Sequence, residues 1–215
     1  MVGFVDDCTQ GVNDFSASPQ PSSETLVEMM RQDSQLWNDL LWTSGGALEL
    51  PKCSFQLIAS QWNRRGTPFL QGGKDAPLFQ VRNGDDEIVV TQTGNYESRK
   101  SLGVHLNPAG TMKKQMEVLR SKSRKFTECL MSNVLSRREA TMMYYGIYLP
   151  SITYPMAVTH LTEDECHQIE TPFLQVLIPR VVYARTMSRA IRYAPLAWGG
   201  AGFRTLYGEQ TVASI

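Results

Sequence analysis

The order of secondary-structure signals along the 215 residues constrains the fold more than any other feature of this sequence. Short apolar, β-branched runs bounded by turn residues lie before residue 107, whereas runs with apolar residues at helical spacing dominate after it. Asn107-Pro108-Ala109-Gly110 breaks the chain between the two regions. Because strands segregated from helices are typical of α+β proteins, we predict an α+β fold rather than an alternating α/β one.

The first region is expected to form one antiparallel sheet backed by a helix. Its strands are expected around Asp6-Asp7, over Phe55 to Trp62, on both sides of Asn83-Gly84, and around Leu102-Gly103-Val104. A helix from Ser23 to Thr43 is expected to start at Ser22 or Ser23 and to stop at Gly45-Gly46. One face of this helix is apolar and is expected to be core; it carries Leu26, Met29, Met30, Leu36, Trp37, Leu40 and Leu41.

The second region is predicted to be helical throughout. A first helix from Thr111 has an apolar line that is expected to be buried, formed by Met112, Met116, Leu119, Phe126, Leu130 and Val134. Ser136 followed by Glu139 has the form of a capping box and begins a helix that is expected to end at Pro150. Thr162 with Glu165 repeats this device, and the helix that follows is expected to be interrupted at Pro172.

The formal net charge is zero, but the charge is distributed unevenly. Residues 1–110 carry 8 Lys and Arg against 13 Asp and Glu, whereas residues 111–215 carry 13 against 8. From Thr111 to Arg138 the count is 8 bases against 2 acids, so the first helix of the second region is basic and amphipathic. Its bases are either a solvated face or a set of phosphate contacts; the candidates for such contacts are Lys113, Lys114, Arg120, Arg124 and Lys125.

Several classes of protein are disfavoured by composition. No apolar run approaches the roughly 20 residues that span a bilayer, and no secretory signal is visible, so we expect no membrane partner and an intracellular location, cytoplasmic or nuclear. The four cysteines lie far apart without a Cys-x-x-Cys pair, which favours reduced thiols over a zinc site or a disulfide framework. Cys166 beside His167 lacks the spaced partners of a metal site.

Two adjacent carboxylates, Asp6 and Asp7, follow the short apolar stretch that ends in Phe4-Val5. Neighbouring aspartates repel each other, and a divalent cation relieves that repulsion; hard oxygen ligands at a strand end suit Mg²⁺ or Mn²⁺. A second pair, Asp85-Asp86, belongs to the Asn83-Gly84 turn and is interpreted as solvated. His105 is interpreted mainly as a surface strand residue.

The segment Phe4 to Asp7 consists of an aromatic residue, one β-branched residue and Asp-Asp. It resembles the palm hairpin of reverse transcriptases, specifically those of the non-LTR retrotransposon type. Further segments carry the resemblance: Gly45 to Cys53, Leu102 to Val104, and Pro195 to Phe203. The resemblance implies that Asp6 and Asp7 hold catalytic metal, that Lys52 donates a proton to the leaving pyrophosphate, and that Leu102, Gly103 and Val104 form a primer grip. For Lys52 the alternative is a solvated loop lysine.

On this resemblance the chain is expected to be the C-terminal part of an RNA-directed DNA polymerase. Residues 1–107 would be a partial palm, 108–160 thumb-like helices and 161–215 a helical connection. The family places a further aspartate on an earlier strand, and the fingers also precede Asp6-Asp7, so we expect weak Mg²⁺ or Mn²⁺ binding and no activity of the chain alone. The expected partners are an RNA template with its DNA primer, and a dNTP only where the missing parts are supplied.

Two alternatives stay open. One is a non-catalytic nucleic-acid-binding remnant that uses only the basic helical half. The other is an α+β interaction protein without nucleic acid. Metal dependence separates the enzyme part from the remnant, and the sequence leaves the oligomeric state undetermined.

Overall fold

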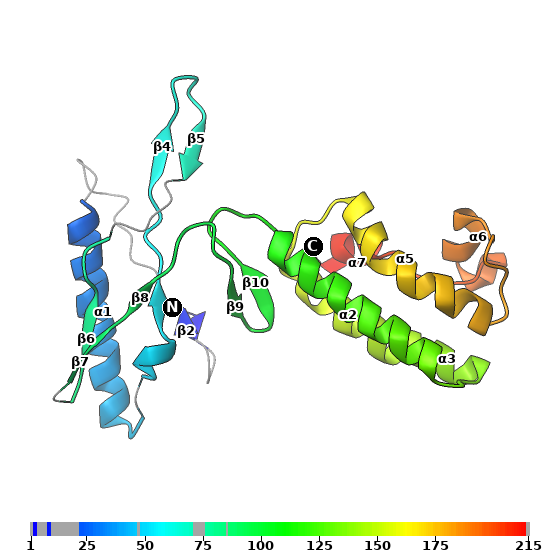
Figure 1. Ribbon diagram of the computed structural model, residues 1–215, viewed down its shortest axis with the longest axis horizontal. Coiled ribbons are helices and arrows are strands. Elements are labelled where there is room, and N and C mark those ends of the chain that lie inside the picture. Colours follow the sequence, from blue (N-terminus) through cyan, green and yellow to red (C-terminus); the bar gives the residue numbers. More distant parts are fainter. Residues whose placement is uncertain are drawn as a thin grey trace. The chain divides into compact units, whose positions relative to one another are not determined.

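The computed structural model describes residues 2–3, 8–9, 22–46, 48–70, 76–84 and 86–213. It mixes helices with short strands, and the strands lie before residue 107, as predicted (Figure 1). The chain forms two compact units. The first comprises residues 1–102 and 107–111, and the second comprises residues 103–106 and 112–215, so residues 112–160 of the predicted thumb-like segment lie in the same unit as the predicted connection.

Helix α1 (Ser23–Thr43) has the predicted bounds. Ser22 is its N-cap, since the Ser22 hydroxyl accepts a hydrogen bond of 3.2 Å from the Thr25 amide. This bond satisfies one of the amides that the first turn of a helix leaves without an internal partner. The local signal at Ser22 was therefore sufficient to place the start of the helix.

The buried side of α1 differs from the predicted one. Leu36 and Leu40, expected in the core, are 60% and 54% exposed, whereas Asn38 is buried. The Asn38 amide donates to the Arg82 carbonyl at 3.0 Å, and its oxygen accepts from the Leu48 amide at 3.3 Å. Because a buried amide group needs hydrogen-bond partners, Asn38 fixes which side of α1 faces the rest of the unit.

The described strands pair two by two. The antiparallel pairs are β1 (Val2–Gly3) with β2 (Cys8–Thr9), β4 (Ser60–Trp62) with β5 (Pro68–Leu70), and β6 (Gln80–Asn83) with β7 (Asp86–Val89). β3 (Ser54–Phe55) runs parallel to β8 (Thr91–Gln92). The last two strands are β9 (Arg99–Ser101) and β10 (Val104–Leu106). The single antiparallel sheet that we expected is not formed by the described strands.

The predicted strand Phe55 to Trp62 is divided into β3 and β4. Phe55 packs edge to face against Phe79, with ring centroids 4.9 Å apart, which holds β3 in the core of the first unit. Beyond it, the Leu57 carbonyl accepts a hydrogen bond of 2.9 Å from the Asn95 side chain. The Asn95 side chain thus takes the place of a neighbouring strand as hydrogen-bond partner of the Leu57 carbonyl, and the strand pairing of β3 ends before this residue.

The Asn83-Gly84 turn is confirmed. β6 and β7 pair in the register Asn83↔Asp86, and Gly84 has a φ of +67°. The β6–β7 hairpin packs on the small core of the first unit. Leu50, from the short helical turn η1 (Leu50–Lys52), also contributes to this core. Its buried residues are Val27, Leu50, Phe79, Val81 and Val90.

Helix α2 (Lys113–Ser132) opens the helical part of the second unit. Leu119 and Leu130 of the predicted apolar line are fully buried, and Met112, Met116 and Phe126 pack against the same core. Val134 lies beyond the end of the helix and is 99% exposed, so its prediction as a core residue was wrong.

Ser136 forms the predicted capping box with Glu139 and begins α3 (Arg137–Met143). The prediction that this helix ends at Pro150 was wrong: it continues through η2 (Tyr144–Tyr148) into α4 (Leu149–Thr153) and then η3 (Tyr154–Val158). η2 is a π-helical turn, in which the Leu149 amide donates to the Tyr144 carbonyl five residues back. A π-helical turn adds one residue to the helix and places Pro150 in the first turn of α4, where its missing amide is tolerated.

Helix α5 (Glu163–Arg180) begins at the predicted Thr162 capping box. It runs without interruption through Pro172, which corrects the expected break. A proline inside a helix removes one backbone hydrogen bond, and packing can offset that loss. Ile169, Phe173 and Leu177 are fully buried on either side of it, and the Phe173 ring stacks on that of Tyr148 with centroids 3.8 Å apart.

The chain then forms α6 (Arg189–Tyr193), η4 (Leu196–Trp198) and α7 (Leu206–Ala213). Between η4 and α7 the backbone passes very close to α6, because a Cβ on Gly200 would lie 2.1 Å from the Ala194 carbonyl oxygen. The Ala201 amide donates to the Ile191 carbonyl at 2.9 Å, which ties this segment to α6. Glycine is therefore required at position 200 for steric reasons.

No helix within the described part of the chain combines the length and the apolar character that crossing a bilayer requires.

Candidate nucleic-acid interface

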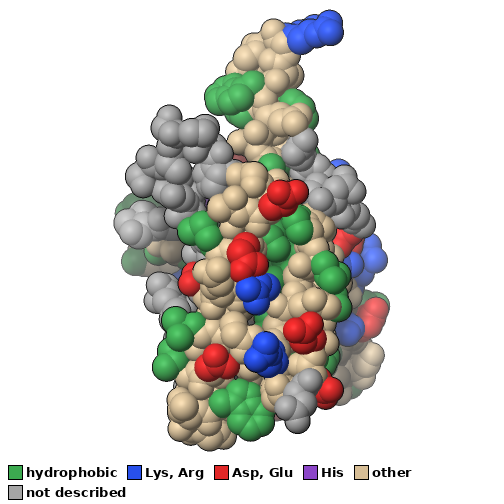
Figure 2. All heavy atoms as spheres, turned by 90° about the vertical axis from the view of Figure 1, so that its left-hand side faces the viewer, with side chains coloured by type: hydrophobic (Ala, Val, Ile, Leu, Met, Phe, Trp, Pro, Cys, Tyr) green, Lys and Arg blue, Asp and Glu red, His purple; other side chains and the backbone are tan. Residues whose placement is uncertain are grey.

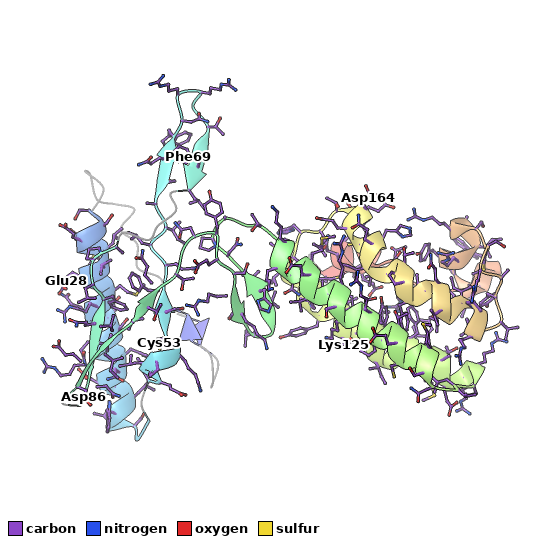
Figure 3. The ribbon with its side chains drawn as sticks, viewed as in Figure 1. Glu28, Cys53, Phe69, Asp86, Lys125 and Asp164 are labelled. Atoms are coloured by element: carbon purple, nitrogen blue, oxygen red, sulfur yellow. The ribbon has the colours of Figure 1, made fainter. Side chains whose placement is uncertain are left out.

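The predicted phosphate-binding residues lie on α2, whose inner side packs against α5 in the second unit. Lys113, Arg124 and Lys125 are exposed (Lys125 is labelled in Figure 3). At 100° per residue these three side chains fall within an arc of about 120°. Within the described ranges, no hydrogen bond or ion pair involves the charged groups of these three residues. They form what we call the outer basic face of α2.

Three other bases of α2 are engaged within the unit. Lys114 pairs with Glu117 at 3.2 Å, and the Lys122 ammonium donates to the Ser151 carbonyl at 2.7 Å. The Arg120 guanidinium donates to the side-chain oxygen of Gln168 on α5. The predicted phosphate-binding residues therefore fall into two groups. The charged groups of Lys113, Arg124 and Lys125 have no partner among the described residues, whereas Lys114, which is also exposed, and Arg120 have one.

A buried serine explains how closely α2 approaches α5. Ser123 is fully buried, and its hydroxyl donates to the Ile169 carbonyl at 2.7 Å and lies 3.2 Å from the Tyr148 hydroxyl. A small polar residue permits close helix packing while its hydroxyl is satisfied. The contact orients α2, so that Arg124 and Lys125, which follow in sequence, face away from the core.

Lys52 lies at the end of η1 and is mostly exposed, with 76% of its side chain accessible. Its ammonium forms an ion pair of 2.8 Å with Glu49. An exposed pair of this kind contributes little stability, so Lys52 can leave Glu49 for another anion at small cost. Asp6 and Asp7, the expected metal ligands, lie outside the described residues.

The primer-grip-like residues do not form the strand that we expected. Leu102 and Gly103 have φ angles of +48° and +84° and make a turn, and Val104 begins β10 with its side chain buried. A leucine in the left-handed region is uncommon, because its Cβ crowds the backbone there. The turn between β9 and β10 therefore replaces a continuous Leu-Gly-Val strand.

The part of the chain that the structure describes contains no cluster of three or more His, Cys, Asp or Glu side chains that could hold a metal ion. Cys166 is buried, and burial raises the pKa of its thiol to about 11. A thiol with such a pKa is protonated at neutral pH and is a poor nucleophile or ligand.

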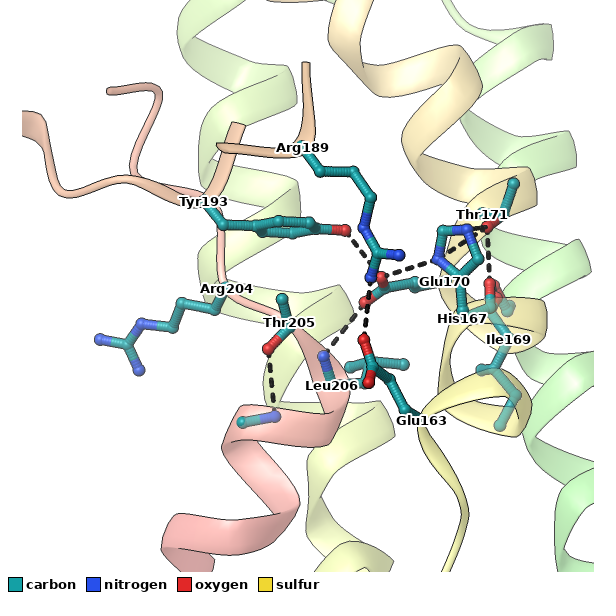
Figure 4. Close-up of polar contacts among 12 residues, drawn as sticks. Glu163, His167, Ile169, Glu170, Thr171, Arg189, Tyr193, Arg204, Thr205 and Leu206 are labelled. Carbon is teal, nitrogen blue, oxygen red and sulfur yellow. Dashed lines mark hydrogen bonds and ion pairs between the residues drawn. The ribbon is translucent and has the colours of Figure 1, made fainter. Parts of the chain in front are cut away.

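A buried carboxylate joins three elements of the second unit, and no sequence pattern predicted it (Figure 4). Glu170 on α5 is 4% exposed. Its Oε1 accepts from the Tyr193 hydroxyl of α6 at 2.7 Å and lies 3.3 Å from His167 Nδ1, and its Oε2 accepts from the Leu206 amide of α7 at 3.1 Å. We call Glu170, Tyr193, His167 and the Leu206 amide the Glu170 cluster. Desolvation and the Glu170 charge raise the pKa of Tyr193.

The Glu170 cluster is interpreted as structural. Every polar contact around it ends on another group of the same unit, and the nearby Arg189 pairs with Glu163 at 3.2 Å rather than with Glu170. Its carboxylate accepts the first amide of α7, where a negative charge also interacts favourably with the helix dipole. The cluster attaches the C-terminal segment to α5, and among the described residues it leaves no coordination position open for a metal ion.

Comparisons of the chain with protein-family models, with curated proteins and with solved structures found no match.

Proposed function

We propose that this chain supplies the duplex-binding part of an RNA-directed DNA polymerase similar to the reverse transcriptases of non-LTR retrotransposons. The support is the order of the segments that resemble this family, from Phe4-Val5-Asp6-Asp7 to Pro195–Phe203, together with the outer basic face of α2. In this proposal the second unit is the thumb and the connection. Its partners are the RNA template and the DNA primer.

The outer basic face of α2 carries the proposal. Lys113, Arg124 and Lys125 project from one side of a helix that is held rigidly by α5 on its other side. Cations held in this way neutralise backbone phosphates without reading bases, so binding is independent of sequence. Each contact with B-form DNA releases about 0.9 counterions, and three contacts therefore contribute about −2.7 to the slope of log affinity against log salt.

The catalytic half of the proposal depends on Asp6, Asp7 and Lys52. In it, Asp6 and Asp7 hold Mg²⁺ or Mn²⁺ together with a further carboxylate of the family's palm, and Lys52 protonates the leaving pyrophosphate. The exposure of the Lys52 ammonium is compatible with such a role, since a phosphate can displace Glu49. In this proposal, primer extension also requires the family's further carboxylate and its fingers, whereas duplex binding requires only the outer basic face of α2.

The test uses a triple variant with Lys113→Gln, Arg124→Gln and Lys125→Gln. Its affinity for duplex is measured by fluorescence anisotropy at salt concentrations from roughly 50 to 300 mM, where counterion release dominates the salt dependence. We expect the slope on a random-sequence DNA duplex to become about 2.7 less negative, and binding to an RNA–DNA hybrid to weaken for all sequences alike.

A matched control removes the same charge from exposed bases of other elements, as Arg82→Gln, Lys100→Gln and Arg185→Gln. A loss that depends only on net charge appears equally in both triple variants and contradicts the proposal. Equal affinity of parent and α2 variant at every salt concentration also contradicts it, and leaves α2 with a solvated face. The remaining alternative is a non-catalytic remnant that binds nucleic acid only through the basic helical half. Such a remnant binds a duplex with a primer terminus equally tightly with and without Mg²⁺, so the affinity of the parent is also measured in both conditions.

A further inference from the structure

A second basic and aromatic surface lies in the first unit, on the hairpin formed by β4 and β5. This hairpin extends away from the rest of the unit, with Phe69 on its second strand (Figures 1 and 3). Its register pairs Trp62 with Pro68 and Gln61 with Phe69. Because successive side chains of a strand point to opposite faces, Trp62 and Phe69 lie on opposite faces of the ribbon.

The tip of this hairpin is ordered by its own hydrogen bonds. The Asn63 side-chain oxygen accepts from the amides of Arg65 and Thr67, each at 2.9 Å, and the Asn63 amide donates to the Thr67 carbonyl at 3.0 Å. Gly66 has a φ of +73°, which a side chain would disfavour. The turn therefore presents Arg64 and Arg65 from a fixed backbone.

The charge of the hairpin has one sign. Arg64 and Arg65 are both exposed, and no Asp or Glu occurs anywhere in residues 51–70. Figure 2 shows Lys or Arg side chains at the end of this projection and hydrophobic side chains below them. Exposed arginines without neighbouring carboxylates attract polyanions.

Its aromatic side chains are unusually accessible. Trp62 is 71% exposed and Phe69 is 45% exposed, although both can pack in a core. At the base of the hairpin the Tyr96 hydroxyl donates to the Leu70 carbonyl at 3.2 Å, and Tyr96 is itself 58% exposed. Flat rings beside cations are the components with which proteins bind single-stranded nucleic acid, since every base has a face that can stack.

We propose that the β4–β5 hairpin is a contact for single-stranded nucleic acid, in which a base stacks on Trp62 while Arg64 and Arg65 hold the adjoining phosphates. An unpaired strand fits better than a duplex, because a base inside a duplex has no free face for Trp62. This proposal does not rest on the function proposed for α2, which lies in the other unit and carries no aromatic residue on its outer basic face.

The test measures binding of the full chain to labelled 12-nucleotide oligo(U) and oligo(dT), and to a duplex of the same length. Loss of one stacked base weakens binding about 5- to 150-fold, so we expect a decrease in this range for Trp62→Ala and a smaller one for Trp62→Phe. Arg64→Gln with Arg65→Gln is expected to make the salt slope about 1.4 less negative, from roughly 0.7 counterions per contact on a single strand.

Trp198→Ala is the matched control, since Trp198 is 83% exposed but lies on η4 of the second unit. It should bind oligo(U) like the parent. The triple variant of α2 should keep its affinity for the single strand, so that failure of the duplex proposal and failure of this one are distinguishable. Quenching of tryptophan fluorescence by oligo(U) should decrease in Trp62→Phe and persist in Trp198→Phe.

Three results would overturn the proposal. The first is single-strand binding that is unchanged in Trp62→Ala and in the double arginine variant. The second is an equal loss of duplex and single-strand affinity, which makes the hairpin a general polyanion contact. The third is binding to vesicles of anionic phospholipid that depends on Trp62 while oligonucleotide binding does not, which makes the hairpin a membrane contact.

Discussion

We expect one carboxylate, that of Glu170, to stabilise the packing of α6 and α7 against α5 in the second unit. In Glu170→Gln the side chain keeps one acceptor oxygen, whereas the native carboxylate uses Oε1 for the Tyr193 hydroxyl and Oε2 for the Leu206 amide. One of these donors then faces the NH₂ group. A hydrogen bond to a charged group contributes about 1.5–3 kcal/mol, so we expect the free energy of unfolding to fall by about 2–4 kcal/mol.

Tyr193→Phe removes one of the same bonds and should cost about 1.5–3 kcal/mol. Because Tyr193 and Glu170 share the 2.7 Å contact, Tyr193→Phe removes it and Glu170→Gln either removes it or makes its acceptor neutral, so the double variant should cost less than the sum of the two. The assay is urea unfolding followed by circular dichroism, with the denaturant slope checked for constancy. Arg189→Gln is the control: its ion pair with Glu163 is more than half exposed on both sides and contributes at most about 1 kcal/mol. Additive losses, or a loss below about 0.5 kcal/mol in Glu170→Gln, would refute the reasoning.

Three further predictions concern the metal, the glycine segment and pH. Asp6 and Asp7 should bind Mg²⁺ or Mn²⁺ only weakly in this chain, since two carboxylates leave most coordination positions to water; submicromolar affinity in a calorimetric titration, unchanged in Asp6→Asn with Asp7→Asn, contradicts this. Gly200→Ala should lower the free energy of unfolding by at least about 1–3 kcal/mol, because its Cβ would meet the Ala194 carbonyl, whereas Gly146→Ala, which meets nothing within 4 Å, should not. Burial raises the pKa of Tyr144 and Tyr148 in the folded chain, so above pH about 10 these tyrosines ionise in the unfolded chain before they do so in the folded one. The free energy of unfolding should therefore be constant below that pH and fall above it, by up to about 1.4 kcal/mol per pH unit for each tyrosine. The fall should be shallower in Tyr148→Phe.

Helix starts could be predicted from the sequence because their causes are local. Ser22, Ser136 and Thr162 each accept a hydrogen bond from an amide three residues on, and this geometry depends on neighbouring residues alone. The Asn83-Gly84 hairpin was predictable for the same reason. These local signals predicted the bounds of α1, the starts of α3 and α5, and the turn between β6 and β7.

The pairing of strands could not be predicted, because it depends on residues far apart in sequence. β3 pairs with β8, more than thirty positions later, and runs parallel to it. The side of α1 that becomes buried depends on Asn38 reaching the Arg82 carbonyl, 44 positions away. An apolar face on a helix indicates which residues can enter a core, and a distant polar contact decides which of them do.

The two prolines that were expected to end or break helices show the same dependence. Pro150 is accommodated by a π-helical turn, and Pro172 by buried side chains on either side of it in α5. The backbone bond lost at a proline has a local cost, whereas the packing that offsets it involves side chains of other helices.

The segments on which the proposed function rests do not carry equal weight. Between Pro195 and Phe203 the glycine at position 200 is explained by a close approach to Ala194, so this segment supports the packing of the second unit whatever that unit binds. Lys113, Arg124 and Lys125 have no such explanation, since their exposed charges contribute nothing to the core. The same holds for Trp62, Arg64 and Arg65 on the hairpin. Because a side chain without a packing role is free to serve binding, the experiments on α2 and on β4–β5 test function in a way that loss of stability cannot imitate.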